Sequence, residues 1–263
     1  MPEITAKKNL GQHFLVDENF IEEMLNFINP KPNEEILEIG AGLGALSIPV
    51  LKRSKKLTAI ELDKRSIEIL SEKAKNIGEL RLIYGDFLKL DLNNLDLKPP
   101  IRLIGNLPYN ISTPILFHCL KYRHLIKDMI FMLQKEVVQR ICATANDKNY
   151  GRLSIMLSQF FEAEFLFTLP PSAFSPPPKV DSAVLIMKTR KNPAWQVKNQ
   201  EFFSEIVKIA FSQRRKMIRK SLEKFISSQN LEKLAINPQL RPENLSGEDF
   251  AKIANFIAQN SSF

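Results

Sequence analysis

The sequence predicts an α/β protein in which an open, doubly wound parallel sheet is followed by a small, all-helical C-terminal domain. From Glu35 onward, short apolar runs alternate with longer amphipathic stretches, which is the pattern of a parallel sheet covered by helices. The first run leads directly into a glycine-rich loop. After about Asn192 the pattern changes to helices only. We therefore expect two domains, residues 1–192 and residues 193–263.

Five apolar runs predict the parallel strands, because each is rich in β-favouring residues and is bounded by Gly, Asp, Asn or Pro. They are EILEI (35–39), LTAIE (57–61), LRLIY (80–84), IRLIG (101–105) and MIFML (129–133). Between them, residues 64–76 repeat apolar side chains at helical spacing, which predicts a crossover helix. Open sheets of this kind bind ligands beyond the carboxyl ends of their strands.

The second half of the chain changes character in two steps. The stretch AFSPPPKVDS contains too much proline for a helix, and the following SAVLIMKT predicts one more strand. From Glu201 the spacing predicts helices, and Ser246 with Asp249 three residues later forms a capping box that predicts the start of a final helix. One apolar stripe is expected on a helix through Phe211, Ile218, Leu222 and Phe225.

The composition favours a globular protein with a polyanionic partner. The chain has 263 residues with 44% hydrophobic content, which suffices for a sizeable core. Lys and Arg outnumber Asp and Glu by 37 to 29, which gives a formal charge of +8. A basic balance suits a nucleic acid, but surplus surface lysine is common, so the charge does not decide the function.

The cysteines and the N-terminus predict the cellular setting. Cys119 and Cys142 lie inside apolar helical patterns and form no Cys-x-x-Cys pair, so we expect buried thiols in a reducing compartment and no metal site. We see neither a secretory leader nor the roughly 20 consecutive apolar residues of a membrane span. The expectation is a cytoplasmic monomer that does not contact membranes.

The glycine loop predicts a nucleotide-like ligand. Residues 40–44 read Gly-Ala-Gly-Leu-Gly between a strand and a helix, where the backbone must approach a ligand closely. Gly40, Gly42 and Ala45 also satisfy the dinucleotide pattern, with the acidic Glu61 about 20 residues later. The loop therefore leaves NAD and S-adenosylmethionine as alternatives, together with a tight turn that binds nothing.

Two acids follow the next two strands. Glu61 ends its strand, where the carboxylate can accept from ribose hydroxyls, and Asp86 follows the third strand, where it can accept from an adenine amine. A lone Asp after a strand is as readily a helix cap or a turn residue, so both interpretations of Asp86 stay open.

The fourth strand ends in a motif that fits amine methylation. Asn106, Leu107, Pro108 and Tyr109 place an amide, a free carbonyl and an aromatic ring at the ligand edge of the sheet. The exocyclic amine of adenine is a poor nucleophile, and the oxygen of Asn106 and the carbonyl of Leu107 can accept its two hydrogens. Pro108 adds no competing donor, and Tyr109 offers a stacking face for an extruded base. An ordinary strand-end turn is the alternative.

With these motifs in place, the chain resembles the ribosomal RNA adenine N6-dimethyltransferase family, and in particular its small-subunit branch, almost from end to end. The matching stretches are NLGQHFL (9–15), EIGAG (38–42), ELD (61–63), GD (85–86), NLPYNIS (106–112), LQKEV (133–137), YGRLS (150–154), FSPPPKVDS (174–182) and FSQRRK (211–216). The resemblance implies a Rossmann-like S-adenosylmethionine-dependent methyltransferase sheet carrying a helical RNA-binding domain.

The resemblance also implies the substrate and the cofactor contacts. It implies transfer of methyl groups from S-adenosylmethionine to two adjacent adenosines in the 3′-terminal hairpin of 16S rRNA, within the immature small ribosomal subunit. The positions that match the family's cofactor contacts are His13, Leu15, Gly40, Glu61, Asp86 and Asn106. His13 stands where some members have Asn, and Gly-Ala-Gly stands where some have Gly-Pro-Gly.

A basic cluster predicts the RNA-binding surface. Six basic residues and one acid lie between Phe211 and Lys224. We expect phosphate contacts from Arg214 and from one helix face that carries Arg215, Lys216, Arg219 and Lys220, with Lys7 and Lys8 adding to the same surface. The alternative is a solvated face opposite the apolar stripe.

Three rival functions remain at this point. An NAD-dependent oxidoreductase shares the glycine loop but gives the Asn-Leu-Pro-Tyr motif no role. A methyltransferase of large-subunit RNA shares the motifs. A non-catalytic ribosome-assembly factor would keep the basic residues and lose the methyl-transfer motif, which is intact here.

Overall fold

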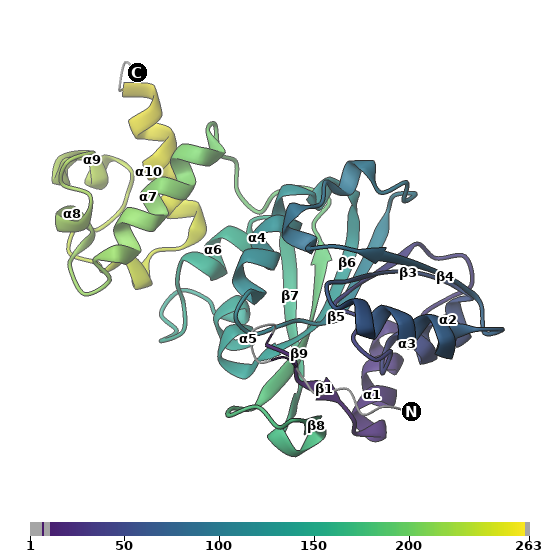
Figure 1. The fold of residues 1–263 in the computed structure, drawn as a ribbon. Helices are drawn as coiled ribbons and strands as arrows, with labels where there is room; N and C mark the ends of the chain where they lie inside the picture. The colour runs from purple at the N-terminus through teal and green to yellow at the C-terminus, as the bar shows by residue number, and fades with distance from the viewer. Residues whose placement is uncertain (1–6, 8–10, 261–263) are drawn as a thin grey trace. The chain divides into compact units, whose positions relative to one another are not determined.

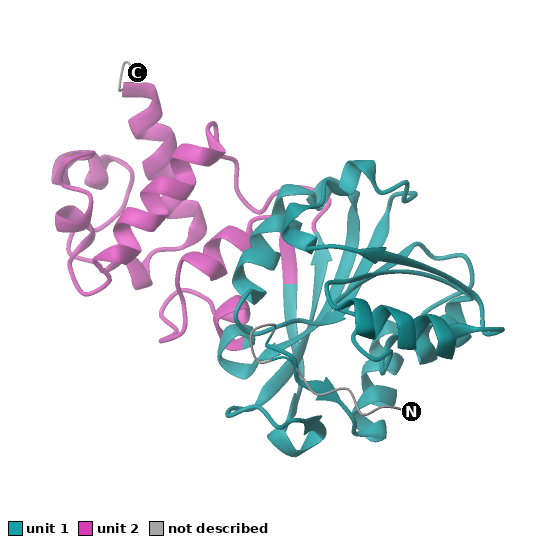
Figure 2. Ribbon diagram, in the orientation of Figure 1, with its two compact units in different colours: residues 1–138, 163–189 teal, residues 139–162, 190–263 magenta. Residues whose placement is uncertain are grey.

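The computed structural model describes Lys7 and residues 11–260, and the chain divides into two compact units. Unit 1 comprises residues 1–138 and 163–189, and unit 2 comprises residues 139–162 and 190–263 (Figure 2). Lys8 and the first two residues of the NLGQHFL stretch lie outside the described residues. The segment 139–162 groups with the C-terminal helices, whereas the sequence-based boundary at residue 192 assigned it to the first domain.

Unit 1 is built on a seven-stranded sheet with helices between its strands (Figure 1). The strands of the chain are β1 (Phe14–Leu15), β2 (Ile36–Ile39), β3 (Lys56–Glu61), β4 (Glu79–Tyr84), β5 (Ile101–Asn106), β6 (Ile126–Gln134), β7 (Phe161–Leu169), β8 (Phe174–Ser175) and β9 (Ser182–Thr189). The helices that follow the early strands are α1 (Glu18–Ile28), α2 (Ser47–Ser54), α3 (Lys64–Ala74), α4 (Ser112–Lys121) and α5 (Lys135–Cys142).

The strand order places the glycine loop and the Asn106 motif side by side. The large sheet runs β4-β3-β2-β5-β6-β9-β7, and β2 pairs in parallel with both β3 and β5. The chain winds outward in opposite directions from β2 and β5, so their carboxyl ends form the switch point at which doubly wound sheets bind ligands. The loop after β2 and the end of β5 therefore meet at one place.

The core forms where apolar helix faces cover the sheet. Asp17 caps α1 by accepting from the backbone N–H of Asn19 at 3.0 Å, and the helix buries Met24, Leu25 and Ile28. These three side chains belong to one buried cluster with residues of the sheet and of α2. Burial of such side chains contributes about 1.5–3 kcal/mol each.

The structure confirms all six predicted strands and the predicted crossover helix, which runs over Lys64–Ala74. The sequence interpretation missed β7, where the run FEAEFLFTL has charged residues in its first half and lies at the edge of the sheet. It also missed the two-residue pair of β1 and β8, which joins Phe14 to Ser175 and Leu15 to Phe174. Pairs this short leave no periodic pattern in a sequence.

Unit 2 is helical apart from the first residues of β7. Besides the end of α5 it contains α6 (Arg152–Ser158), α7 (Gln200–Ser212), α8 (Ile218–Ser221), α9 (Ser228–Lys233) and α10 (Gly247–Asn260). Phe211 contacts both Tyr150 and Phe250, with ring centroids 6.0 and 5.8 Å apart, which explains why the segment 139–162 joins this unit. The predicted capping box is confirmed, since Asp249 N–H donates to Ser246 Oγ and Ser246 N–H donates to Asp249 Oδ2.

The expectation of one long helix carrying both the apolar stripe and the basic face is wrong. Helix α7 ends at Ser212 and α8 begins at Ile218, so Arg214, Arg215 and Lys216 lie in the turn between them. The backbone N–H of Ile218 donates to Leu240 at 2.6 Å instead of continuing the α7 ladder. The acceptor for this N–H therefore comes from a loop that is distant in sequence. The spacing of nearby residues does not reveal such a partner.

The two cysteines differ in burial. Cys119 is buried in α4, where desolvation raises the pKa of its thiol, and Cys142 at the end of α5 is only half-buried. The expectation of a buried thiol is therefore confirmed for Cys119 and wrong for Cys142. Among the described residues, no helix combines the length and the hydropathy that crossing a membrane requires.

A buried ion-pair network closes the sheet at the amino ends of its strands. Arg102 on β5 donates through Nε to Asp128 at 2.9 Å and through Nη1 to Glu34 at 2.9 Å. Arg102 and Asp128 are only 8% and 7% exposed. Removing one partner of a buried pair leaves the other charge desolvated without compensation.

We therefore expect Arg102→Met to lower the free energy of unfolding by about 3–5 kcal/mol, because Asp128 then stays buried without its cation. Lys208→Met is the matched control, since Lys208 and its partner Glu205 are 58% and 52% exposed, and an exposed pair is worth less than about 1 kcal/mol. Urea denaturation followed by circular dichroism measures both. If both variants lost the same free energy of unfolding, the buried network would not be what makes Arg102 important for stability.

Candidate functional site

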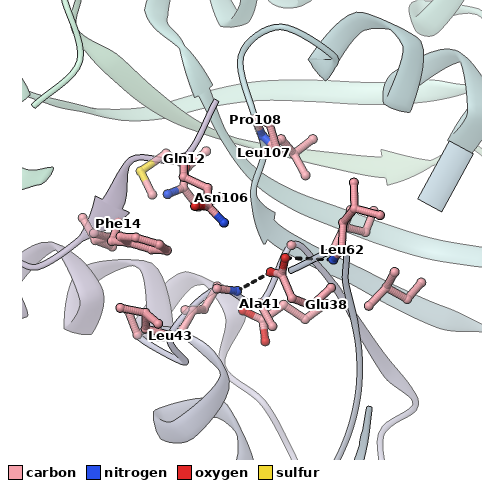
Figure 3. A pocket seen from close by; sticks show the side chains of 18 of the residues that line it. Gln12, Phe14, Glu38, Ala41, Leu43, Leu62, Asn106, Leu107 and Pro108 are labelled. Atoms are coloured by element: carbon pink, nitrogen blue, oxygen red, sulfur yellow. Dashed lines mark hydrogen bonds between the residues drawn. The ribbon is translucent and has the colours of Figure 1, made fainter. Parts of the chain in front are cut away.

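A cavity of about 670 Å³ lies at the carboxyl ends of β2, β3 and β5, within the usual volume range of small-molecule sites. All the residues that the sequence assigned to cofactor binding or catalysis line it, namely His13, Leu15, Gly40, Glu61, Asp86, Asn106, Leu107, Pro108 and Tyr109. Figure 3 shows Asn106 in this cavity near Gln12 and Phe14 of the N-terminal segment. Residues that are distant in sequence thus face one space.

The glycine loop adopts a conformation that requires glycine. Gly40, Gly42 and Gly44 have φ angles of +74°, +53° and +85°. A Cβ atom on Gly44 would also lie 2.6 Å from Leu70 Cδ1 of α3. The loop therefore needs glycine both for its left-handed backbone and for its packing, and it forms one wall of the cavity.

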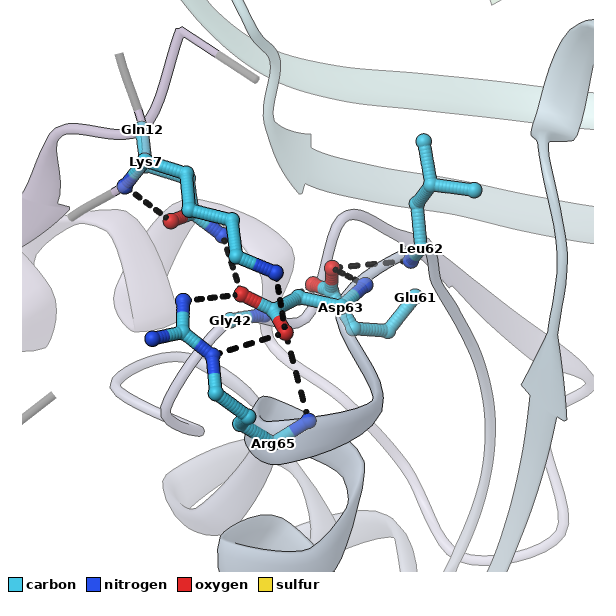
Figure 4. Close-up of polar contacts among 7 residues, drawn as sticks. All are labelled: Lys7, Gln12, Gly42, Glu61, Leu62, Asp63 and Arg65. Atoms are coloured by element: carbon cyan, nitrogen blue, oxygen red, sulfur yellow. Dashed lines mark hydrogen bonds and ion pairs between the residues drawn. The ribbon is translucent and has the colours of Figure 1, made fainter. Parts of the chain in front are cut away.

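Glu61 is held rigidly at the end of β3. Its Oε2 atom accepts from the backbone N–H of Gly42 at 2.7 Å, and its Oε1 atom accepts from the N–H groups of Leu62 and Asp63 at 2.8 Å each (Figure 4). The side chain is therefore oriented before any ligand binds. Three backbone donors use most of the roughly four lone-pair positions of a carboxylate.

Asp86 is a helix cap, which was one of the two interpretations of this residue, and it also lines the cavity. Its Oδ1 atom accepts from the backbone N–H of Leu88 at 3.0 Å and so caps the short 3-10 helix Phe87–Lys89. The residue borders the cavity beside Gly85. Capping and ligand contact are thus compatible at this position, because a carboxylate has a second oxygen.

The amide of Asn106 has a defined orientation. Its Nδ2 atom donates to the backbone carbonyl of His13 at 2.9 Å. A carbonyl oxygen can only accept, so the amino end of the amide must face His13. The Oδ1 atom is consequently left for another partner, in a residue that lines the cavity.

The rest of the motif is fixed by the neighbouring strands. The backbone N–H of Leu107 donates to Met132 on β6 at 3.0 Å, while the Leu107 carbonyl accepts no hydrogen bond from the described part of the chain. The hydroxyl oxygens of Tyr109 and Ser182 share a hydrogen bond of 2.5 Å. Burial raises the pKa of the Tyr109 phenol, although the bond to Ser182 opposes the shift, so this side chain is neutral.

The N-terminal segment is tied down beside the cavity by Asp63 (Figure 4). The Asp63 carboxylate accepts from Lys7 Nζ at 3.3 Å, from Gln12 Nε2 at 3.5 Å and from Arg65 Nη2 at 2.6 Å. The hydrogen bond from Arg65 holds the pKa of Asp63 well below its usual range, so the carboxyl is ionised. The sequence interpretation did not single out Asp63.

Glu38 is a second residue of the site that the sequence interpretation missed. It lies in β2 two residues before the glycine loop, is 2% exposed and lines the cavity, and its Oε2 atom has no hydrogen-bond partner among the described residues. Burial raises its pKa to about 8, and the nearby charge of Glu61 acts in the same direction. The sequence does contain a signal for this residue, because Glu38 is an acid inside an otherwise apolar strand.

This raised pKa predicts a pH-dependent stability. Between the ordinary value of 4.5 and about 8, the folded state keeps a proton that the unfolded state releases. Stability therefore falls as the pH rises through this window, by at most about 1.4 kcal/mol per pH unit. We expect Glu38→Gln to become progressively more stable than the wild type between about pH 5 and 8, with a constant difference above that.

Thermal unfolding of cofactor-free protein at a series of pH values checks this expectation. The exposed Glu68→Gln variant is the matched control, and its stability should run parallel to that of the wild type. A gap between Glu38→Gln and wild type that does not change with pH would contradict a buried, protonated Glu38.

The predicted RNA-binding residues differ in their surroundings. Arg214 is engaged within unit 2, where it donates to Glu243 at 2.6 Å and to the Lys148 carbonyl at 2.5 Å. Lys220 pairs with Glu223 at 3.6 Å. Arg215, Lys216 and Arg219 are exposed and form no ion pair with any described residue. In the described residues, no group of His, Cys, Asp and Glu side chains has the arrangement of a metal site.

The fold and the site together define the class of Rossmann-like methyltransferases. Two solved structures share the fold. A dimethyladenosine transferase from Plasmodium falciparum superposes with a TM-score of 0.76 at 26% identity, covering 92% of this chain and 96% of that one. The 23S rRNA methyltransferase ErmE gives 0.74 at 23% identity over 94% and 100%, a likeness that concerns the fold.

The sequence comparisons specify the family. A family model for ribosomal RNA adenine dimethylase matches residues 4–259. The chain is 50% identical over 257 residues to the ribosomal RNA small subunit methyltransferase A of Dichelobacter nodosus, covering 98% of this chain and 97% of that protein. It is 44% identical to the Marinobacter nauticus protein of the same name, over 96% and 92%. The chain belongs to the ribosomal RNA adenine dimethylase family, which rules out the NAD-dependent oxidoreductase.

Proposed function

We propose that this protein transfers methyl groups from S-adenosylmethionine to N6 of two adjacent adenosines in the 3′-terminal hairpin of 16S rRNA. The observation that carries the proposal is the orientation of Asn106, whose oxygen is left available by the hydrogen bond to His13. Relatives at 44–50% identity that are named for the small ribosomal subunit support this substrate over large-subunit RNA. We place the activity in the cytoplasm, on the immature small subunit, and infer a monomer.

The cavity suits S-adenosylmethionine because it offers carboxylates to a cationic ligand. Glu38 has an oxygen without a partner among the described residues, and a positively charged ligand beside it would lower its raised pKa and favour its ionised form. Gly40 and its loop give backbone access, while Glu61 has about one acceptor position left for a ribose hydroxyl. Asp86, His13 and Leu15 border the same cavity. When bound, the cofactor supplies an electrophilic methyl group on a sulfonium centre.

The residues after β5 hold the adenine amine. Asn106 Oδ1 and the Leu107 carbonyl lie on adjacent residues, and neither accepts a hydrogen bond from the described part of the chain. The N6 amine of adenine has two hydrogens to donate to them. Accepting both orients the nitrogen lone pair and favours its change to tetrahedral geometry. Methyl transfer is an in-line displacement, so this positioning supplies much of the acceleration. Pro108 contributes no N–H that would compete.

A strong base is unnecessary in this mechanism. Methylation of N6 produces a cationic nitrogen that loses its proton readily to water. The neutral Tyr109 phenol is suited to stacking on the extruded base, a contact worth about 1–3 kcal/mol. Catalysis therefore rests on hydrogen-bond acceptors and on alignment.

Unit 2 provides the charge for RNA. It carries 16 Lys and Arg residues against nine Asp and Glu, whereas unit 1 carries 21 against 20. The turn that bears Arg215 and Lys216 leaves both side chains exposed, with Arg219 following on α8. We propose that these residues, with Arg214 and Lys220, contact RNA phosphates. Arg214 and Lys220 must exchange their carboxylate partners to do so.

We expect Asn106→Ala to lower methyl transfer by about 100-fold or more while leaving RNA binding nearly unchanged, because its contact is made mainly in the transition state. Labelled S-adenosylmethionine and unmethylated small subunits, followed by mapping of the modified base, provide the measurement. Asn26→Ala on the exposed face of α1 is the control. Wild-type protein that labels large-subunit RNA, or no RNA, would overturn the proposed function, and a fully active Asn106→Ala would overturn the mechanism.

Replacing Arg215 and Lys216 together with Ala should weaken RNA binding and reduce the slope of log K against log salt by about 2, since each lost phosphate contact removes about one unit. Filter binding over a range of salt concentrations gives the slope. Lys52 and Lys55 on the other unit serve as the matched control pair. An unchanged slope for the Arg215 and Lys216 variant would place the phosphate contacts elsewhere.

A further inference from the structure

The ring of Tyr109 is held from two directions, at its hydroxyl by Ser182 and on one face by His13. At its tip, the phenol shares a hydrogen bond with Ser182 at 2.5 Å. On one face, the His13 ring stacks at a centroid distance of 5.6 Å and an interplanar angle of 25°. This distance falls within the range of favourable ring pairs.

Both holding residues are themselves anchored. Ser182 is fully buried at the start of β9, where it pairs with Gln134 on β6, and the adjacent Asp181 carbonyl accepts from Lys135. The Nδ1 atom of His13 lies 2.8 Å from the carbonyl oxygen of Pro176, and the next residue, Phe14, pairs with Ser175. The anchors come from the long sheet and from the loop after β8, so motion of the Tyr109 ring requires breaking contacts in both.

The Tyr109 ring is in part accessible from the cavity. Among the described residues, the ring that stacks on Tyr109 is that of His13. The side chain is half-buried and lines the cavity. A planar ligand in the cavity can therefore reach the part of the Tyr109 ring that His13 does not cover.

We propose that Ser182 and His13 are positioning residues that make Tyr109 a one-sided stacking platform for the target base. The proposal rests on the proposed function. Ser182 acts through the Tyr109 hydroxyl and fixes the tilt of the ring, while His13 closes one face and restricts the base to the other. Neither side chain is assigned contact with the reacting atoms.

A double-mutant cycle tests the role of Ser182. Ser182→Ala and Tyr109→Phe should each slow single-turnover methylation of small subunits by about 5- to 10-fold, the usual worth of one hydrogen bond. If Ser182 acts through the phenol, the double variant should be no slower than either single one. Multiplying effects would overturn the proposal. Affinity for S-adenosylmethionine, measured by calorimetry, should be unchanged throughout, and the exposed Ser172→Ala should match the wild type.

The role of His13 is tested by removing and restoring the ring. His13→Ala should lower the single-turnover rate by about 5-fold, and His13→Phe should recover most of it because a ring again covers Tyr109. His124→Ala is the control variant, and its single-turnover rate should match that of the wild type. A lower KM for RNA in His13→Ala would instead show that the imidazole occupies the place of the base, which contradicts the proposal.

One measurement on the protein itself separates this proposal from the proposed function. In protein with 13C-labelled tyrosine, the Tyr109 signal should shift in His13→Ala, because the ring current of the imidazole is lost, while the signals of Tyr84, Tyr122 and Tyr150 stay in place. This result does not depend on which RNA is methylated. An unshifted Tyr109 signal would overturn the stacking, even if the wild type methylates adenosines as proposed.

Discussion

The hydrogen bond from Asn106 to the His13 carbonyl is the contact on which the site depends. An amide presents a donor end and an acceptor end, and only the acceptor end can hold an adenine amine. Because a carbonyl oxygen accepts and never donates, His13 fixes the choice before substrate arrives. The bond joins residues 93 positions apart, so the chemistry of the β5 end relies on the correct course of the N-terminal segment, which Asp63 and the β1–β8 pair secure.

The two units differ in net charge. Unit 1 has almost no net charge, and its carboxylates at the cavity act locally on the chain itself: Glu61 holds the glycine loop and Asp63 holds Lys7. Nearly all of the surplus positive charge belongs to unit 2. A basic unit of this kind attracts polyanions. Under the proposed function its phosphate contacts carry no sequence information, so selection rests on RNA shape and on the base that reaches the cavity.

The sequence predicted the parts of the fold that local pattern controls. The six apolar strands, the glycine loop and the Ser246 capping box each follow from residues close together in the chain. The turn at Arg215, the edge strand β7 and the pairing of Phe14 with Ser175 depend on distant partners and were missed or misplaced. In the site, motif residues were found by type, but Asp63, Ser182 and Glu38 act through contacts or burial that spacing does not show.

Buried polar groups are paired at the amino ends of the strands and partly unpaired at their carboxyl ends. At the amino ends, Arg102 pairs with both Asp128 and Glu34, so these charges are compensated within the protein. At the carboxyl ends, Glu38 Oε2 has no partner and the Leu107 carbonyl accepts no hydrogen bond from the described residues. An unpaired buried polar group costs about 1–3 kcal/mol. A ligand that pairs these groups recovers that cost on binding, and this difference favours ligand binding at the carboxyl ends of the strands.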